Sequence, residues 1–426
     1  MYYRCTNQKC HKVVESVTSV LHCQSCGSIL FRIYEKDLDG DDWCSLGIYW
    51  HDQAGDNDDK VIACFRRSAA LGSGWGTSNL AWCMEDGVGV KMDKRQAVWL
   101  YNQAIEMGHS PALCSLGVCY EKGDGVGKDK EKAVEYYFEA ADQGFIRGQI
   151  LMARCYTEGI GVEKDLKKAL EWRRMAALQG DIQAQHNLAH CYEYGVGCPI
   201  SPELAIKWYL KAAMAGYNES QYSLGQFCQT GQWLEQDVKS AVSWYTKASI
   251  NKHPEATYAL AQCYMQGIGL DKDTSQGFKL FFLAVQFGQA EALEQIGQCF
   301  MTGVATEASP EKAFAWWQVG AKLDVVSCQI HVASCLEEGI GVERNLEKAV
   351  HWYRKSAEIG SIDGLNCLFR CLMKHTENPE ERTELFALCQ GKIEGLLEGH
   401  SDGFPLDREH GDDYQLVLDI LSQKSI

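Results

Sequence analysis

Cysteine recurs at a fixed interval of 36 residues along most of this chain. A single-core globular domain has no reason to keep such a period, whereas stacked copies of one structural unit must keep it. The period therefore predicts a repeat protein, and it predicts that these thiols mark a buried packing position. Phe227 occupies the one position without a cysteine, and the series itself is Cys83, Cys119, Cys155, Cys191, Cys263, Cys299, Cys335 and Cys371.

Other residue types follow the same period and define the first half of the repeat. Each cysteine stands three positions after a large apolar residue and, in every copy but the last, two positions after a small one, as in Leu188, Ala189 and Cys191. Residues three apart lie on one face of a helix, so this spacing predicts a helix with a narrow apolar face. Paired glycines such as Gly195 and Gly197 follow in most copies and are expected to end that helix, because glycine adopts positive φ.

The second half of the repeat begins with a column of residues that favour helix N-caps. Alanines and a large residue, usually tryptophan, follow at helical spacing, as in Ala205 and Trp208, and we interpret the tryptophans as interhelical core. The sequence thus predicts eight helix–turn–helix units over residues 73–360. An irregular capping repeat is expected at 37–72, a degenerate repeat at 361–395 and a final helix or tail at 396–426. The capping column is Asp93, Asp129, Asp165, Ser201, Asp237, Asp273, Ser309 and Asn345.

The segment QHNLAHCYEYGVG at 185–197, followed by AIKWYLKAA at 205–213, resembles the Sel1-like repeat, a relative of the tetratricopeptide repeat. The resemblance recurs in all eight copies. It implies an all-α fold, a right-handed superhelical solenoid of paired helices with a concave groove, used as a scaffold or adaptor. Secreted members of that family carry paired cysteines that bridge each hairpin. Most repeats here lack the second cysteine, which favours reduced thiols.

By the same resemblance, variable positions on the first helix of each repeat face the concave side. One such position directly precedes the cysteine column and another lies four residues further back, so the two share a helix face. Aromatic rings supply contact area and amides bond a peptide backbone, so this face is expected to bind an extended peptide. The alternative is a solvated groove floor without a partner. The predicted groove residues are Arg154, His186, His190, Tyr222, Gln226, Tyr258, Gln262, Glu294 and Gln298.

Four cysteines near the N-terminus fall outside the period: Cys5, Cys10, Cys23 and Cys26. They form two short pairs, as tetrahedral Zn²⁺ requires of four thiolates. Apolar residues around the second pair predict short β-strands, and residues 1–36 resemble a zinc ribbon, although the first pair is spaced more widely than usual. With four protein ligands the metal would be structural, and it would supply much of the folding energy of so short a segment. The alternative is a short cap that contains ordinary cysteines.

The net charge of −16 is unevenly distributed. Residues 1–36 carry five basic and two acidic side chains, so the acidic excess lies in the repeats. Nucleic-acid backbones bind clustered lysine and arginine, which makes the repeats a poor match for them. The chain has no run of about 18 apolar residues, and its first residues lack the pattern of a secretory signal. We therefore expect a cytoplasmic protein without membrane insertion; delivery into another cell stays open.

The sequence carries no Ser/His/Asp set, paired-carboxylate motif or phosphate-binding loop. We therefore expect a non-enzymatic scaffold or adaptor that binds a protein or peptide partner, with a structural Zn²⁺ site at its N-terminus. The alternative is a nucleic-acid-associated adaptor, in which the zinc ribbon contacts DNA or RNA and the solenoid recruits proteins. A mobility-shift assay with the isolated ribbon at several salt concentrations would discriminate between the two.

Overall fold

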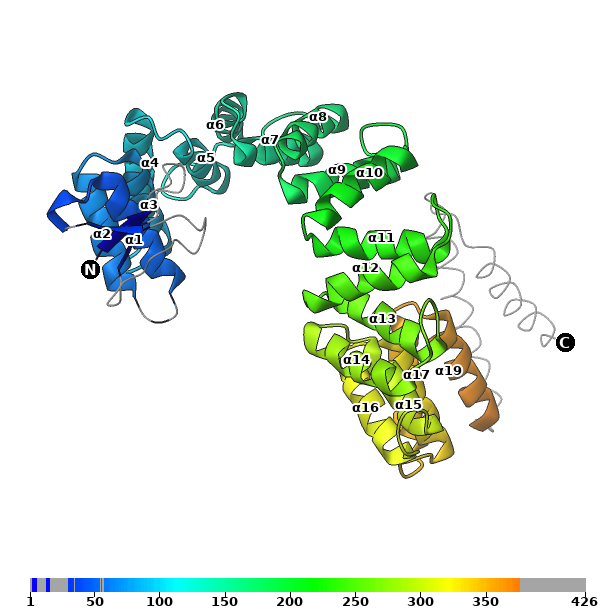
Figure 1. The fold of residues 1–426 in the computed structure, drawn as a ribbon. Helices are drawn as coiled ribbons and strands as arrows, with labels where there is room; N and C mark the ends of the chain where they lie inside the picture. The colour runs from blue at the N-terminus through cyan, green and yellow to red at the C-terminus, as the bar shows by residue number, and fades with distance from the viewer. Residues whose placement is uncertain are drawn as a thin grey trace. The chain divides into compact units, whose positions relative to one another are not determined.

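The computed structural model of the chain describes residues 35–53, 55 and 57–375 with their side chains, and residues 2–5, 13–15 and 30–33 by their backbone. These residues belong to two compact units, Met1–Ala215 (unit 1) and Gly216–Ile426 (unit 2) (Figure 1). Within the described residues, the helices of both units follow one another in pairs, as the 36-residue period predicts.

Three short strands begin unit 1 and form an antiparallel sheet in the order β2–β1–β3. The central strand β1 (Tyr2–Cys5) pairs with β2 (Val13–Glu15) and with β3 (Leu30–Ile33), and the end of β1 at Cys5 lies opposite Leu30. The other three predicted zinc ligands, Cys10, Cys23 and Cys26, lie outside the described residues. The zinc site therefore stays a prediction.

Unit 1 continues with a 3₁₀ turn and five helical hairpins. These elements are η1 (Glu35–Asp37), α1 (Gly40–Asp52), α2 (Asp58–Ala70), α3 (Gly74–Asp86), α4 (Lys94–Glu106), α5 (Ala112–Lys122), α6 (Lys130–Asp142), α7 (Ile146–Glu158), α8 (Leu166–Leu178), α9 (Ile182–Tyr194) and α10 (Pro202–Met214).

Unit 2 contains, in its described residues, four further hairpins and one last helix. These elements are α11 (Asn218–Thr230), α12 (Val238–Ile250), α13 (Pro254–Gln266), α14 (Thr274–Phe287), α15 (Ala292–Thr302), α16 (Pro310–Lys322), α17 (Val326–Glu338), α18 (Leu346–Glu358) and α19 (Ile362–His375).

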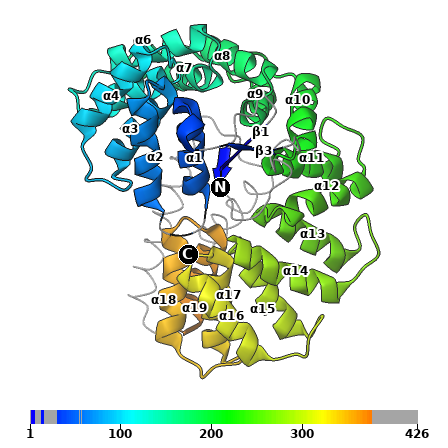
Figure 2. The ribbon, with the colours of Figure 1, turned by 60° about the vertical axis from the view of Figure 1, so that its left-hand side comes forward.

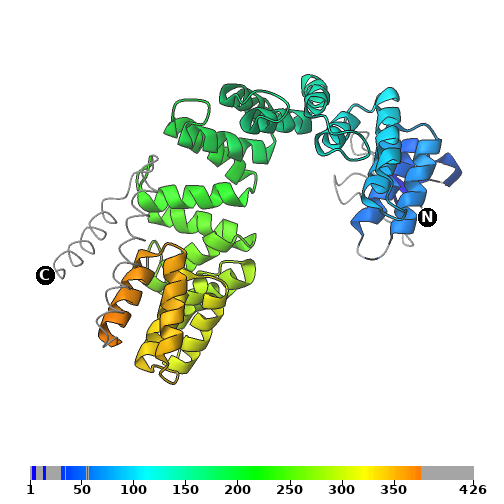
Figure 3. The same ribbon diagram turned by 180° about the vertical axis from the view of Figure 1, so that it is seen from behind.

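Within each unit the helices form two layers, with odd-numbered helices in one and even-numbered helices in the other (Figures 2 and 3). We call the odd-numbered helices first helices and the even-numbered ones second helices. Each first helix packs on the second helix that follows it, and each second helix packs on the next first helix of its unit. Successive first helices also contact each other, for example α5 with α7 and α15 with α17. This nearest-neighbour stacking is the packing expected of a solenoid.

The second helices begin where the capping column predicts. Asp165, for example, accepts hydrogen bonds from the backbone N–H groups of Lys167 and Lys168, each at 3.0 Å, and six other members of the column cap their helices in the same way. Ser201 departs from the prediction. It occupies the N-cap position of α10 but its side chain makes no capping bond, because its hydroxyl is directed to Glu203 at 3.3 Å.

The glycines after the first helices have two separate tasks. Gly159 ends α7 in the left-handed conformation, with φ of 74°, and donates its N–H to the carbonyl of Cys155 at 2.8 Å. Gly161 also has positive φ, and a Cβ there would collide with the carbonyl of Lys130 in the preceding hairpin. Glycine is therefore needed both to end the helix and to let neighbouring hairpins approach.

The period cysteines are buried, as predicted. All eight are at most 4% exposed, and Phe227 fills the equivalent place in α11. Burial raises the pKa of these thiols, to about 12 for Cys119 and about 11 for Cys155. A thiol held in its neutral form is a poor nucleophile, so these residues pack the core of each hairpin and are not reaction centres.

The tryptophan column is only partly the interhelical core that the sequence suggested. Trp208 is buried, but Trp172, Trp244, Trp316 and Trp352 are half-buried. Lysines three residues further along three of these helices lie over the indole rings, for example Lys247 at 4.0 Å from the ring centre of Trp244. The fully buried rings come instead from the next position along the second helices, which holds Tyr101, Tyr137, Tyr209, Tyr245 and Tyr353.

No helix between Gly40 and His375 combines the length and the apolar character needed to cross a lipid bilayer.

Candidate functional site

The predicted groove residues all lie on first helices, but they divide between the two units. Arg154, His186 and His190 are in unit 1, on α7 and α9. Each unit therefore presents its own part of this face, which we call the first-helix face. The other six, on α11, α13 and α15 of unit 2, are Tyr222, Gln226, Tyr258, Gln262, Glu294 and Gln298.

In unit 2 the two tyrosines are held by neighbouring rings. Tyr222 is half-buried, stacks on His253 with ring centres 5.1 Å apart, and accepts a hydrogen bond from Nε2 of the exposed Gln226 at 3.0 Å. Tyr258, one repeat further on, packs against Phe281 at 5.6 Å. Burial raises the pKa of both phenols, so both remain neutral hydrogen-bonding groups. This arrangement presents aromatic edges and amides in fixed positions.

The same face of unit 2 is acidic. Glu294 lies 3.6 Å from Nε2 of His331, and the hydrogen bond from His331 lowers the pKa of its carboxyl group. Three exposed glutamates stand at equivalent positions, 36 residues apart, at the starts of α11, α13 and α15: Glu219, Glu255 and Glu291.

The corresponding face of unit 1 carries cations and imidazoles. Arg154 is half-buried on α7 and forms an ion pair with Glu121 of α5. His186 lies edge-on to the ring of Tyr209 at 5.3 Å, and the exposed His190 lies near Tyr194 at 4.4 Å.

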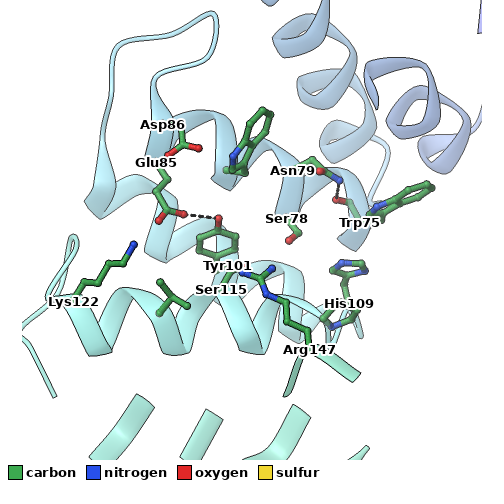
Figure 4. Close-up of a pocket in the computed structure, with 13 residues that line it drawn as sticks. Trp75, Ser78, Asn79, Glu85, Asp86, Tyr101, His109, Ser115, Lys122 and Arg147 are labelled. Carbon is green, nitrogen blue, oxygen red and sulfur yellow. Dashed lines mark hydrogen bonds between the residues drawn. The ribbon is translucent and has the colours of Figure 1, made fainter. Parts of the chain in front are cut away.

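A cavity of about 460 Å³ opens between α3 and α5, two repeats before the cavity that contains Arg154, the first groove residue predicted from the sequence. Figure 4 shows that it runs along the two helices, with Trp75 and His109 at one end and Glu85 at the other. Its walls include Ser78 and Trp82, which precede Cys114 and Val118 by one period. The predicted groove residues do not include Ser78 and Trp82, because that prediction began on α7, two repeats further along, although the same two columns contain them.

A smaller cavity of about 140 Å³ lies two repeats further along unit 1, between α7 and α9. Ile150, Arg154 and Arg173 line it at the positions that Ser78, Trp82 and Tyr101 hold in the larger cavity. The opening between successive first helices is therefore a recurring feature of unit 1, and its lining changes from repeat to repeat.

One cluster in the described residues contains three groups that could ligate a metal ion: Glu337, Cys371 and His375, whose ligand atoms lie within 4.8 Å of one another. Burial raises the pKa of Glu337, but hydrogen bonds from His375, Tyr353 and Lys374 outweigh it, so the net pKa is lowered. Nζ of Lys374 is 3.4 Å from Oε1 of Glu337. The carboxylate is thus satisfied by donors and a neighbouring ammonium, and this network accounts for the cluster without a metal.

The repeats of this chain match a known protein family. The family model described as "Sel1 repeat" matches eight consecutive segments, 77–109, 110–145, 146–181, 182–217, 218–253, 254–286, 290–325 and 326–361. A search of curated proteins found no match.

Two solved structures share the fold. A protective antigen of uropathogenic Escherichia coli with an SLR fold is 29% identical, with a TM-score of 0.66, and the match covers 79% of this chain and 72% of the other. A Sel1 repeat protein from Oxalobacter formigenes is 26% identical, with a TM-score of 0.59, and the match covers 72% of this chain and 89% of the other.

The eight matched segments span more than half of the chain, and they fall on the hairpins whose buried cysteine column, capped second helices and glycine turns were described above. The chain therefore belongs to the Sel1 repeat family.

Proposed function

We propose that this protein is a non-enzymatic scaffold that binds an extended peptide segment of a partner protein on its first-helix face. Sel1 repeat proteins are generally protein-interaction scaffolds, which supports the class of function. The observation that carries the assignment to this face is the repeated set of ring-supported tyrosines in unit 2. Tyr222 and Tyr258 occupy the same position in successive repeats, and each is half-buried with one side braced by another ring.

Such rings suit peptide binding because they are already ordered. A side chain that is fixed before binding loses little conformational entropy when a partner docks, and tyrosine contributes large contact area. The hydrogen bond from Gln226 to Tyr222 also orders an exposed amide at this face. The cavities between first helices in unit 1 add recesses in which partner side chains could be held.

Selection from a displayed random-peptide library on the immobilised full chain tests this assignment. We expect the wild type to enrich peptides whose binding falls at least tenfold in the double variant Tyr222→Ala/Tyr258→Ala. Trp99→Ala is the matched control, because Trp99 is 59% exposed but lies on a second helix, α4. Circular dichroism must show that both variants keep their helix content. Unchanged binding by the folded double variant would place the site elsewhere.

We further propose that Cys5, Cys10, Cys23 and Cys26 bind one structural Zn²⁺ ion. Their spacing supports this, and so does the pairing of β1 with β3, which sets Cys5 opposite a residue four positions after Cys26. Bound metal would fix the two cysteine pairs and stabilise the N-terminal segment. Metal analysis of freshly purified protein is expected to give about one zinc per chain, lost on replacement of Cys23 and Cys26 by serine. Zinc well below one equivalent would contradict the proposal.

A further inference from the structure

One hairpin of unit 1, α7–α8, lacks a polar pair that three other hairpins of this unit share. In the hairpins before and after it, a buried tyrosine donates to a glutamate sixteen residues earlier: Tyr137 to Glu121 at 2.7 Å and Tyr209 to Glu193 at 2.5 Å. In α7–α8 the equivalent residues are Arg173 and Thr157. Nη2 of Arg173 donates to the hydroxyl of Thr157 at 2.7 Å, and Nη1 lies 3.4 Å from Sγ of Cys191. A phenol–carboxylate pair has become a guanidinium–hydroxyl pair.

This exchange gives Arg173 a positive charge that no ion pair neutralises among the described residues. In the part of the chain that the structure describes, both hydrogen-bond partners of Arg173 are neutral, and no carboxylate lies within ion-pair distance of it. Arg154, the other arginine nearby, differs because Glu121 neutralises it. A half-buried guanidinium with a neutral partner has donors and charge left for an anion.

Both guanidinium groups line the cavity of about 140 Å³ between α7 and α9, together with Thr157 and the exposed amide of Asn187. Buried Ala153 and Ala184 also line it. The volume corresponds to about five water molecules. The cavity is large enough to hold a small planar anion on a short stem.

We propose that this cavity binds a carboxylate group of the partner peptide, with Arg173 as its main cationic contact. The inference rests on the proposed function, since the anion is one group of the peptide that the first-helix face binds. A planar guanidinium matches a carboxylate through parallel hydrogen bonds, and Asn187 offers a further donor. A phosphate dianion fits less well, because only one of the two arginines lacks a counter-charge and Glu158 stands at the cavity.

The test compares two blocked five-residue alanine peptides with the full chain. One carries glutamate at its centre and the other carries glutamine. Binding is followed by the NMR signals of the Ala153 and Ala184 methyl groups, which line the cavity. The wild type is expected to bind the glutamate peptide at least tenfold more tightly. A carboxylate can come from a glutamate side chain or from the C-terminus of a peptide, and an alanine peptide with a free C-terminus distinguishes the two. If this peptide binds more tightly than the blocked glutamate peptide, the cavity binds chain ends.

The matched variant is Thr157→Glu/Arg173→Tyr, which introduces the tyrosine–glutamate pair that the two neighbouring hairpins contain. It should keep the fold and lose the preference for glutamate over glutamine. Arg173→Gln is the second variant; it retains a donor for Thr157 without the charge, and it should lose the same preference. A preference that survives in either folded variant would overturn the inference, as would an equal response of the wild type to both peptides. Tighter binding of a phosphoserine peptide would overturn the assignment to a carboxylate.

The two proposals fail in different ways. If none of the peptides changes the methyl signals of Ala153 and Ala184, while binding of library peptides still depends on Tyr222 and Tyr258, the carboxylate assignment is wrong and the proposed function stands. If the glutamate preference is seen but no library peptide binds through Tyr222 and Tyr258, the cavity is real and the wider peptide face is wrong.

Discussion

At the scale of single residues, the most regular polar feature is the buried tyrosine of the second helices. The acceptor of its hydroxyl varies between repeats, and this variation provides an internal comparison. Tyr209 donates to the carboxylate of Glu193 at 2.5 Å, whereas Tyr245 donates to the amide oxygen of Gln229 at 2.7 Å. Both rings are 1% exposed, so the two sites differ mainly in the charge of the acceptor.

We therefore expect Tyr209→Phe to destabilise the protein more than Tyr245→Phe. A hydrogen bond to a charged group contributes about 1.5–3 kcal/mol and a neutral one about 0.5–1.5 kcal/mol. Urea unfolding of the two variants beside the wild type measures the difference in free energy of unfolding. Equal losses would show that burial of the ring, and not the charge of the acceptor, determines the contribution of this position.

The sequence predicted some residue roles and missed others for physical reasons. It predicted buried cysteines, because Phe227 shares their position and only a packing site accepts both side chains. It did not predict the tyrosine–acid pair, although Tyr137 and Glu121 recur at a constant separation of sixteen residues in several copies. The cavity beside Arg173 was beyond a single sequence, because its walls come from three helices.

At the scale of helices, eight second helices begin with a residue that favours the N-cap position, and in the structure one of these residues makes no capping hydrogen bond. The sequence identifies residue types that can cap a helix, but the capping bond depends on side-chain orientation, which neighbouring residues decide. Asp165 caps α8 with two hydrogen bonds, while Ser201 turns its hydroxyl to Glu203 and leaves α10 without a side-chain cap.

This difference predicts unequal effects of two similar substitutions. Asp165→Ala should lower the free energy of unfolding by about 1 kcal/mol, because two backbone donors lose their acceptor. Ser201→Ala should change the free energy of unfolding by less than about 0.5 kcal/mol, as a substitution at an ordinary surface site does. Thermal melting followed by circular dichroism can rank the two. A loss at Ser201 as large as that at Asp165 would mean that the serine caps α10 in solution.

At the scale of the whole molecule, the contact pattern is nearly one-dimensional: hairpins in each unit pack mainly on their immediate neighbours. The sequence alone was sufficient to predict this architecture, because an exact period requires equivalent interfaces along the chain. It could not predict the division into units Met1–Ala215 and Gly216–Ile426, since the period continues across position 215 without a change. The interfaces themselves use interchangeable residues. Ala140 and Ala141 of α6 and Ala176 and Ala177 of α8 occupy equivalent buried positions.

Deleting residues 145–180 tests whether one repeat is a removable unit. The deletion joins Gly144 to Asp181, so the helix junction keeps a glycine with the same positive φ, and Asp181 still caps α9. Ala140 and Ala141 would then pack on α9 in place of the deleted alanines. We expect unchanged helix content per residue and a sigmoidal thermal transition, measured by circular dichroism, with melting lowered by a few degrees.

Deleting residues 145–162 provides the matched control, because it removes α7 and the following turn but leaves α8 without the first helix of its own hairpin. The buried cysteine column would lose one member, and the apolar face of α8 would be exposed to water. This shorter deletion is expected to destabilise the protein more than the one twice its length, with loss of helix content and binding of a hydrophobic dye. If the 36-residue deletion were the more damaging of the two, stability would depend on the particular side chains of this hairpin and not on the repeated interface.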